Sequence, residues 1–258
     1  MLADAHLHLV DLARLEPGFP EAARGLAWKG CAASHERPEF EASEALRARL
    51  AAGGLAAVAS FGIHPQALGI GDPGFLERLA AEGRIAAIGE AGFDFFGDRP
   101  GLVRSPENEA AQREAFELQL GIAERRGLPL ILHIRKAMDL AFEYSPRLKR
   151  LPAAIFHSYS GGAGEAASLL SRGVEAYFSF GSVVLNGHKR AIEACASLPA
   201  ERLLSETDAP WQPPRGSAYC ALGDIVKVVA GIAAIRGRPA EDAGETLSAN
   251  FSRAYGGS

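Results

Sequence analysis

The chain has 258 residues, of which 48% are apolar, and a formal net charge of −4. This composition predicts a globular fold with a large core and excludes a disordered chain. An acidic chain without a run of lysine or arginine is not a strong general nucleic-acid binder, although bound cations can still attract such a substrate to one site.

The three cysteines, Cys31, Cys195 and Cys220, are scattered and form no C-x-x-C pair. This pattern indicates buried thiols in a reducing compartment rather than a disulfide framework. No stretch reaches the roughly 18 apolar residues of a membrane span, and no charged and apolar leader opens the chain. We therefore expect a cytoplasmic protein that makes no membrane contact.

Eight short apolar segments alternate with helical patterns along the chain. They are apolar on both faces, as parallel strands covered by helices should be. The predicted strands are Leu2–Ala5, Leu26–Ser34, Leu55–Phe61, Arg84–Glu90, Leu128–His133, Ala153–His157, Val174–Ser179 and Arg202–Glu206. The clearest helix is Glu107–Arg126, with Ser105-Pro106 before it and Gly127 after it. Eight such repeats predict one TIM-type (β/α)8 barrel over residues 1–258, since this fold typically takes roughly 250 residues.

Polar side chains follow the first and fourth of these strands. His6 and His8 form an H-x-H pair, and residues two apart on a strand point to the same face. Glu90 ends the fourth strand, and its carboxylate is able to bridge two cations. The carboxyl ends of barrel strands meet at one face, so these side chains are expected to converge there.

The later strands add further candidate ligands. His133 ends the fifth strand and is followed by Arg135, whose guanidinium suits an anionic group such as phosphate. His157 ends the sixth strand. Asp208 follows the eighth, where a carboxylate can ligate a metal and take a proton from an attacking water. A metal site at the carboxyl ends of the strands, and hence a metal-dependent hydrolase, is predicted from His6, His8, Glu90, His133, His157 and Asp208.

Four other residues carry weaker signals. His64 follows the third strand and is expected to contact the substrate or polarise the leaving group. Asp94 suits a direct ligand and a hydrogen-bond partner of a ligand equally well. His35 and His188 are expected to be ordinary loop or surface histidines.

Six segments, in this order, resemble the TatD family of metal-dependent deoxyribonucleases. They are Asp4–Leu9, Gly62–Pro65, Ile88–Asp94, Leu130–Arg135, His157–Gly161 and Glu206–Pro210. The resemblance implies a barrel of the amidohydrolase type with two divalent metal ions, which are zinc, manganese or magnesium. It also implies cleavage of phosphodiester bonds in DNA by a metal-activated water.

The resemblance further implies a role for each candidate residue. Two groups of ligands would share Glu90: His6, His8, Glu90 and Asp208 for one metal, and Glu90, His133 and His157 for the other. Asp208 and His64 would be catalytic, while His64 and Arg135 would contact the substrate. DNA would be a transient partner, and the oligomeric state stays open.

The sequence also departs from the family pattern. Residues 10–60 match poorly, Phe93-Asp94-Phe95-Phe96 replaces the usual Leu-Asp-Tyr, and Tyr159 replaces the usual Phe. The loops Phe95–Ser105 and Ala209–Tyr219 are expected to shape the substrate pocket. Two alternatives therefore stay open: a hydrolase of a small amide, lactone or aminoacyl ester on the same two-metal barrel, and a non-catalytic descendant that binds a ligand.

Overall fold

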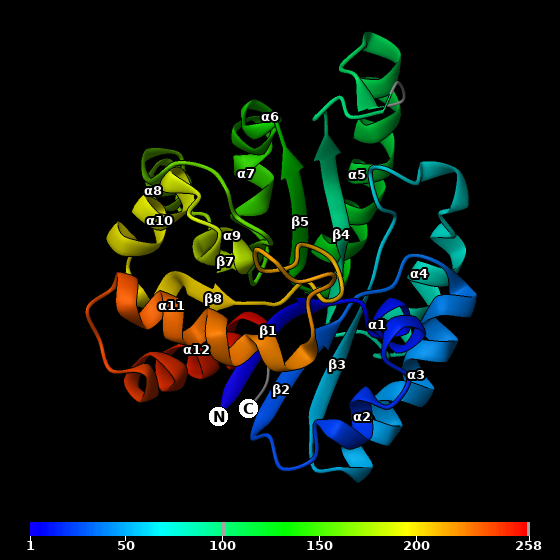
Figure 1. Ribbon diagram of the computed structural model, residues 1–258. Helices are drawn as coiled ribbons and strands as arrows, with labels where there is room; N and C mark the ends of the chain where they lie inside the picture. Colours follow the sequence, from blue (N-terminus) through cyan, green and yellow to red (C-terminus); the bar gives the residue numbers. More distant parts are fainter. Residues whose placement is uncertain (100–101, 257–258) are drawn as a thin grey trace.

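The computed structural model describes residues 1–99 and 102–256. Eight parallel strands form one sheet whose order follows the chain, with helices around it (Figure 1). The strands are β1 (Leu2–Leu7), β2 (Trp28–Ala32), β3 (Ala56–Phe61), β4 (Ala87–Asp94), β5 (Leu130–Arg135), β6 (Ala154–Phe156), β7 (Ala176–Phe180) and β8 (Leu203–Ser205). The predicted (β/α)8 barrel is confirmed, and each predicted strand overlaps an observed one.

Helices cover the outside of the barrel. The α-helices are α1 (Leu9–Leu15), α2 (Phe19–Ala22), α3 (Arg37–Ala52), α4 (Pro73–Ala81), α5 (Pro106–Arg126), α6 (Met138–Glu143), α7 (Ser145–Leu148), α8 (Ala163–Ser171), α9 (Ser182–Leu185), α10 (Lys189–Ser197), α11 (Ile225–Ile235) and α12 (Ala240–Ala254). Short 3-10 turns are η1 (Leu68–Ile70), η3 (Ala200–Arg202) and η4 (Leu222–Asp224). Within the described ranges, every helix is too short or too polar to cross a membrane.

The first and last strands meet beyond the end of β8. The amide of Asp208 donates to the carbonyl of His6 at 2.9 Å, and the amide of His8 donates to the carbonyl of Ala209 at 2.7 Å. These bonds nearly close the barrel. They also tie the segment that carries the two N-terminal histidines directly to the segment that carries Asp208.

Strand β4 is longer than predicted and runs four residues past Glu90. Its pairing with β5 shifts register between Ile88 and Ala91, so Glu90 lies at an irregularity in the middle of the strand. Gly92 has a φ of +145°, and a Cβ atom there would collide with the carbonyl oxygen of His133. Glycine therefore lets β4 continue beside β5, which brings Asp94 next to Arg135.

Apolar residues fill the barrel below the polar face. Ile131 and Ile155 precede His133 and His157 by two residues, so they point to the same side of their strands. Both belong to a buried cluster completed by Phe251 of α12 and by Tyr255, which follows that helix. The candidate ligands thus lie above this apolar cluster, toward the carboxyl end of the strands, which is the usual location of barrel active sites.

Candidate metal centre

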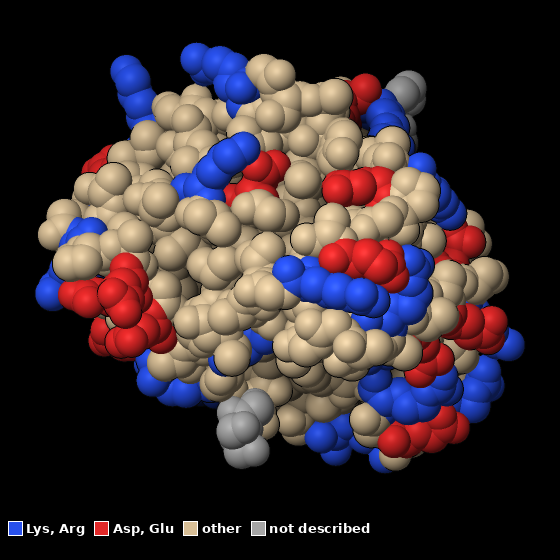
Figure 2. Space-filling model, turned by 60° about the horizontal axis from the view of Figure 1, so that its bottom comes forward, with Lys and Arg blue, Asp and Glu red and all other residues tan. Residues whose placement is uncertain are grey.

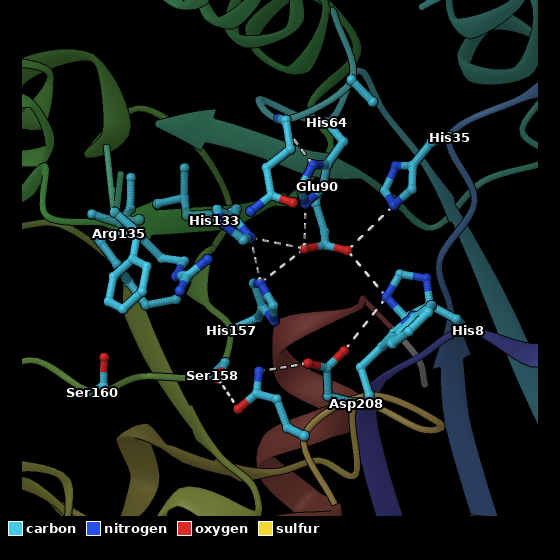
Figure 3. Close-up of a pocket in the computed structure, with 18 of the residues that line it drawn as sticks. His8, His35, His64, Glu90, His133, Arg135, His157, Ser158, Ser160 and Asp208 are labelled. Carbon is cyan, nitrogen blue, oxygen red and sulfur yellow. Dashed lines mark hydrogen bonds and ion pairs between the residues drawn. The ribbon is translucent and has the colours of Figure 1, made fainter. Parts of the chain in front are cut away.

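The carboxylate of Glu90 lies at the middle of a ring of imidazoles and is almost fully buried, with 2% exposure (Figure 3). Oε1 is 3.0 Å from His6 Nε2, 3.3 Å from His8 Nε2 and 3.3 Å from His35 Nε2. Oε2 is 2.8 Å from His157 Nε2, 3.2 Å from His133 Nδ1 and 3.4 Å from His64 Nε2. Six of the seven histidines therefore converge on one carboxylate, three on each oxygen.

Asp208 lies on the side of His8. Its Oδ1 atom is 3.4 Å from His8 Nε2 and 3.9 Å from His6 Nε2. Its Oδ2 atom accepts a hydrogen bond of 2.6 Å from the side-chain amide of Gln212, whose own oxygen accepts from the hydroxyl of Ser158 at 2.8 Å. The structure thus brings all six sequence-predicted ligands into one site.

The spacing of these donor atoms fits divalent cations. The two nitrogens His6 Nε2 and His8 Nε2 are 3.3 Å apart, and His133 Nδ1 and His157 Nε2 are 3.1 Å apart. Ligands about 2.0–2.1 Å from a tetrahedral ion lie about 3.3–3.4 Å from each other, so the spacing of each nitrogen pair and its oxygen of Glu90 suits a divalent cation. A mixed set of imidazole and carboxylate donors suits zinc or manganese.

The charges of the site lead to the same conclusion. Burial opposes ionisation of Glu90, but the neighbouring His157 and His6 outweigh burial and hold the pKa of this carboxyl well below its ordinary value. Burial also disfavours charge on His8, yet Asp208 and Glu90 raise the pKa of His8 well above its usual range. Burial likewise disfavours charge on His157, yet Glu90 raises the pKa of His157 to about 9. Protons on His8 and His157 thus balance Glu90 and Asp208 in the metal-free chain, and a bound cation would replace those protons.

Asp94 lies behind His133 and does not face the centre. Burial favours its protonated form, but the hydrogen bonds from His133, the amide of Phe96 and Gln66, with the charge of His133, together outweigh burial and lower the pKa of Asp94. Its Oδ2 atom is 2.9 Å from His133 Nε2, and it also accepts from Gln66 Nε2 at 2.6 Å and from Arg135 Nη1 at 3.1 Å. A proton on His133 Nε2 leaves Nδ1 free to act as a ligand, which is the usual role of such a carboxylate partner.

His64 and Arg135 lie beside the centre. The backbone amide of Gln66 donates to His64 Nδ1 at 3.1 Å, so the proton of the neutral ring is on Nε2, which faces Glu90. Burial lowers the pKa of His64 to about 4. The guanidinium of Arg135 is 35% exposed and lies 4.0 Å from the centre of the Phe96 ring.

The expectation for His35 was wrong. Its ring points into the centre, with Nε2 3.3 Å from Glu90 and a side-chain exposure of only 14%. Its backbone amide donates to Glu39 Oε2 at 2.7 Å and its Nδ1 lies 3.4 Å from the carbonyl of Gly62, which together turn the ring inward. His188, by contrast, is exposed at the start of α10, as expected, although it also lines the cavity above the centre.

Two buried carboxylates were not singled out from the sequence. Glu206 accepts from the amide of Ser158 at 2.6 Å, and burial raises the pKa of Glu206 to about 8. Asp4 accepts from the amide and the hydroxyl of Thr207 at 2.8 and 2.7 Å, and burial raises the pKa of Asp4 to about 7. The signal was present for Glu206, because this carboxylate directly follows β8 (Leu203–Ser205) at the carboxyl end of a barrel strand.

A cavity of about 1370 Å³ opens above the centre. Its lining includes Phe96 and Arg99 from the loop after β4 and Trp211 and Gln212 from the loop after β8. Both loops that were expected to shape the pocket therefore contribute to it, although residues 100 and 101 of the first loop lie outside the described residues. The cavity is large enough for a flexible polymeric substrate. Five of the six candidate ligands line it, namely His8, Glu90, His133, His157 and Asp208, whereas His6 is fully buried.

Comparisons with known proteins agree with this arrangement. The family model "TatD related DNase" matches residues 3–256. The "3'-5' ssDNA/RNA exonuclease TatD" of Erwinia billingiae is 32% identical over 197 residues, which are 70% of this chain and 69% of that protein. The "Uncharacterized metal-dependent hydrolase TatD" of Mycobacterium tuberculosis is 33% identical over 187 residues, or 70% of this chain and 68% of that protein.

Solved structures share the fold. A TatD homologue from Escherichia coli superposes with a TM-score of 0.83 at 24% identity and covers 98% of this chain and 97% of its own. A TatD family hydrolase from Entamoeba histolytica superposes with a TM-score of 0.78 at 16% identity, covering 100% and 98%. With its barrel and a family match along nearly its whole length, the chain belongs to the TatD family of metal-dependent hydrolases.

Proposed function

We propose that this hydrolase is a nuclease that shortens single-stranded DNA or RNA from the 3' end. The observation that carries the proposal is Glu90, whose two oxygens each face a cluster of imidazole nitrogens on the floor of a large open cavity, with Arg135 on the wall. The relatives named as 3'-5' ssDNA/RNA exonucleases support the choice of substrate. We further propose that residues 1–258 act as one barrel.

Two cations would share Glu90 as a common ligand. The remaining ligands would be His6, His8 and Asp208 for one cation, and His133 and His157 for the other. We favour zinc or manganese, with magnesium less suited to so many nitrogen donors. Such a pair stabilises the attacking and the leaving oxygen of a phosphodiester when it is bound.

The protein's own groups have separate roles in the proposed reaction. Asp208 accepts a proton from the attacking water, while Gln212 holds its second oxygen at 2.6 Å and fixes the orientation of the carboxylate. The Nε2–H group of His64 donates to a phosphoryl oxygen. The guanidinium of Arg135 binds the phosphate from the cavity wall, where a planar fork of donors matches two oxygens.

The nucleic acid is proposed to be attracted by charged groups inside the cavity and not by the net charge of the protein. On the face shown in Figure 2, acidic and basic side chains are interspersed, in agreement with the net charge of −4. Cations on the floor and Arg135 and Lys136 on the wall would supply the positive charge that a phosphate chain requires.

The test is cleavage of a 5'-labelled single-stranded oligonucleotide by the protein loaded with zinc or manganese. We expect a ladder of products shortened from the 3' end, loss of cleavage after chelation, and recovery on return of the metal. Glu90→Gln should be inactive, whereas Leu118→Ala on the exposed face of α5 is the matched control. Turnover of a small ester or amide by metal-loaded protein that leaves every oligonucleotide intact would instead favour the alternative hydrolase.

A further inference from the structure

Two aromatic side chains are exposed at the mouth of the cavity. Among the large apolar side chains that are exposed in the described parts of the chain, only Phe96 at 46% and Trp211 at 53% are aromatic. Both line the cavity above the candidate metal centre. Exposed aromatic surface beside a site of this kind commonly marks a ligand contact, since leaving it in water is unfavourable.

The barrel places these two residues on opposite sides of the centre. Phe96 follows β4, which carries Glu90, and Trp211 follows β8 and Asp208. The eight strands are arranged in chain order, so β4 and β8 are four strands apart in either direction around the barrel. A chain that crosses the centre would therefore pass one aromatic side chain on each side of the reacting phosphate.

Phe96 is held in place and is paired with cations. Its amide donates to Asp94 Oδ1 at 2.9 Å, and its carbonyl accepts from Lys136 Nζ at 3.1 Å. The guanidinium of Arg135 lies 4.0 Å from the ring centre and Lys136 Nζ lies 4.9 Å from it. A base stacked on the uncovered part of this ring would have its phosphate within reach of two positive groups.

Trp211 is exposed on a loop that hydrogen bonds hold in place. The next residue, Gln212, donates to Asp208 and accepts from Ser158. The side chain of Asn186 donates to the carbonyl of Pro213 at 3.1 Å. Little ordering is therefore required when a ligand stacks on the indole, which favours binding.

We propose that Phe96 and Trp211 are base-stacking platforms that receive the nucleobases on the two sides of the scissile phosphate. This inference rests on the proposed nuclease function and names the feature of the substrate that the site selects. Only unpaired bases can stack on two separate side chains, so the platforms favour single strands. Every base has a π face, so we expect weak preference for base identity.

The test combines leucine variants with abasic substrates. Phe96→Leu and Trp211→Leu are assayed on single-stranded oligonucleotides that carry one abasic nucleotide at each of the three positions nearest the 3' end. Loss of one stacked base typically weakens interaction by about 5- to 150-fold, so each variant should lose a factor in this range in kcat/KM on the intact strand. One of the three abasic positions should be the one whose base stacks on the replaced side chain. There the unmodified protein should lose the same factor in kcat/KM, and the leucine variant should show no further loss on that substrate.

Two additional measurements separate stacking from a change in shape. Phe96→Tyr and Trp211→Phe retain an aromatic face and should cleave faster than the leucine variants, while Leu118→Ala serves as the surface control. Trp28 is buried, so quenching of tryptophan emission by a non-hydrolysable phosphorothioate oligonucleotide in metal-loaded protein should come from Trp211 and disappear in Trp211→Leu.

The outcomes are distinguishable. If the unmodified, metal-loaded protein cleaves no oligonucleotide, the proposed function fails and this inference fails with it. If that protein cleaves the strand but the leucine variants match it, or if the losses from variant and abasic position simply multiply, the stacking platforms alone are refuted.

Discussion

Replacement of Asp94 by asparagine tests how His133 is held for the metal. Oδ2 of Asp94 accepts from His133, Gln66 and Arg135, and Oδ1 accepts from the amide of Phe96. An asparagine keeps only one acceptor oxygen and places an amide donor where the other was. Whichever way the new side chain turns, a buried donor faces another donor.

The expected effects follow from these contacts. An unsatisfied buried donor costs about 1–3 kcal/mol, so Asp94→Asn should lower the free energy of unfolding of the metal-free protein by that amount. A neutral amide also favours a proton on His133 Nε2 less strongly, which leaves Nδ1 less available to a metal. Loss of such a carboxylate partner typically weakens metal binding by about 10- to 100-fold.

Competition with a chromophoric zinc chelator measures this affinity, and urea denaturation measures the stability. Asp98→Asn is the matched control, because it removes the same charge 4.0 Å from Arg135 Nη1 and its carboxylate is 42% exposed. Wild-type zinc affinity in Asp94→Asn, or an equal loss in Asp98→Asn, would refute the proposed role of Asp94.

Three further outcomes are expected. Loading the metal-free protein with zinc at about 100 times Kd should add about 2.7 kcal/mol of stability for each bound ion. Two ions should therefore raise Tm by about 10–20 °C in calorimetry, whereas Glu90→Gln should show no such rise. Gly92→Ala should lower the free energy of unfolding, measured in urea, by about 3 kcal/mol or more, because the new Cβ atom collides with β5. Gly97→Ala is the control and should cost about 1–2 kcal/mol, since its φ is also positive but the space around it is open. Equal losses in the two variants would contradict this account. His35→Ala should reduce kcat/KM about tenfold, whereas Leu118→Ala on the exposed face of α5 should change it little. Identical values would remove His35 from the site.

The sequence was most informative where a polar residue ends an apolar strand. His133 and His157 each follow such a run, and both are found at the carboxyl end of the barrel. Prediction succeeds here because parallel strands of one barrel point their ends to one face. Residues far apart in the chain are thereby brought together without any knowledge of loop structure.

The sequence was least informative where individual hydrogen bonds and close backbone contacts determine which way a side chain points or how far a strand extends. His35 follows the end of β2, in the region that matched the family pattern poorly, and it is turned inward by bonds to Glu39 and Gly62. The extension of β4 to Asp94 likewise depends on close contact between Gly92 and the backbone of β5. Neither contact leaves a periodic pattern in its own segment.

Metal affinity and substrate affinity are expected to depend on different residues of this barrel, and Asp94 contacts residues of both groups. It binds His133 of the proposed metal centre, and it also binds Arg135 and the amide of Phe96 on the cavity wall. A change at Phe96 should therefore alter substrate affinity and leave zinc affinity unchanged, because that side chain does not touch a metal ligand. Asp94→Asn should alter both, since one carboxylate orients the ligand and the phosphate-binding guanidinium together.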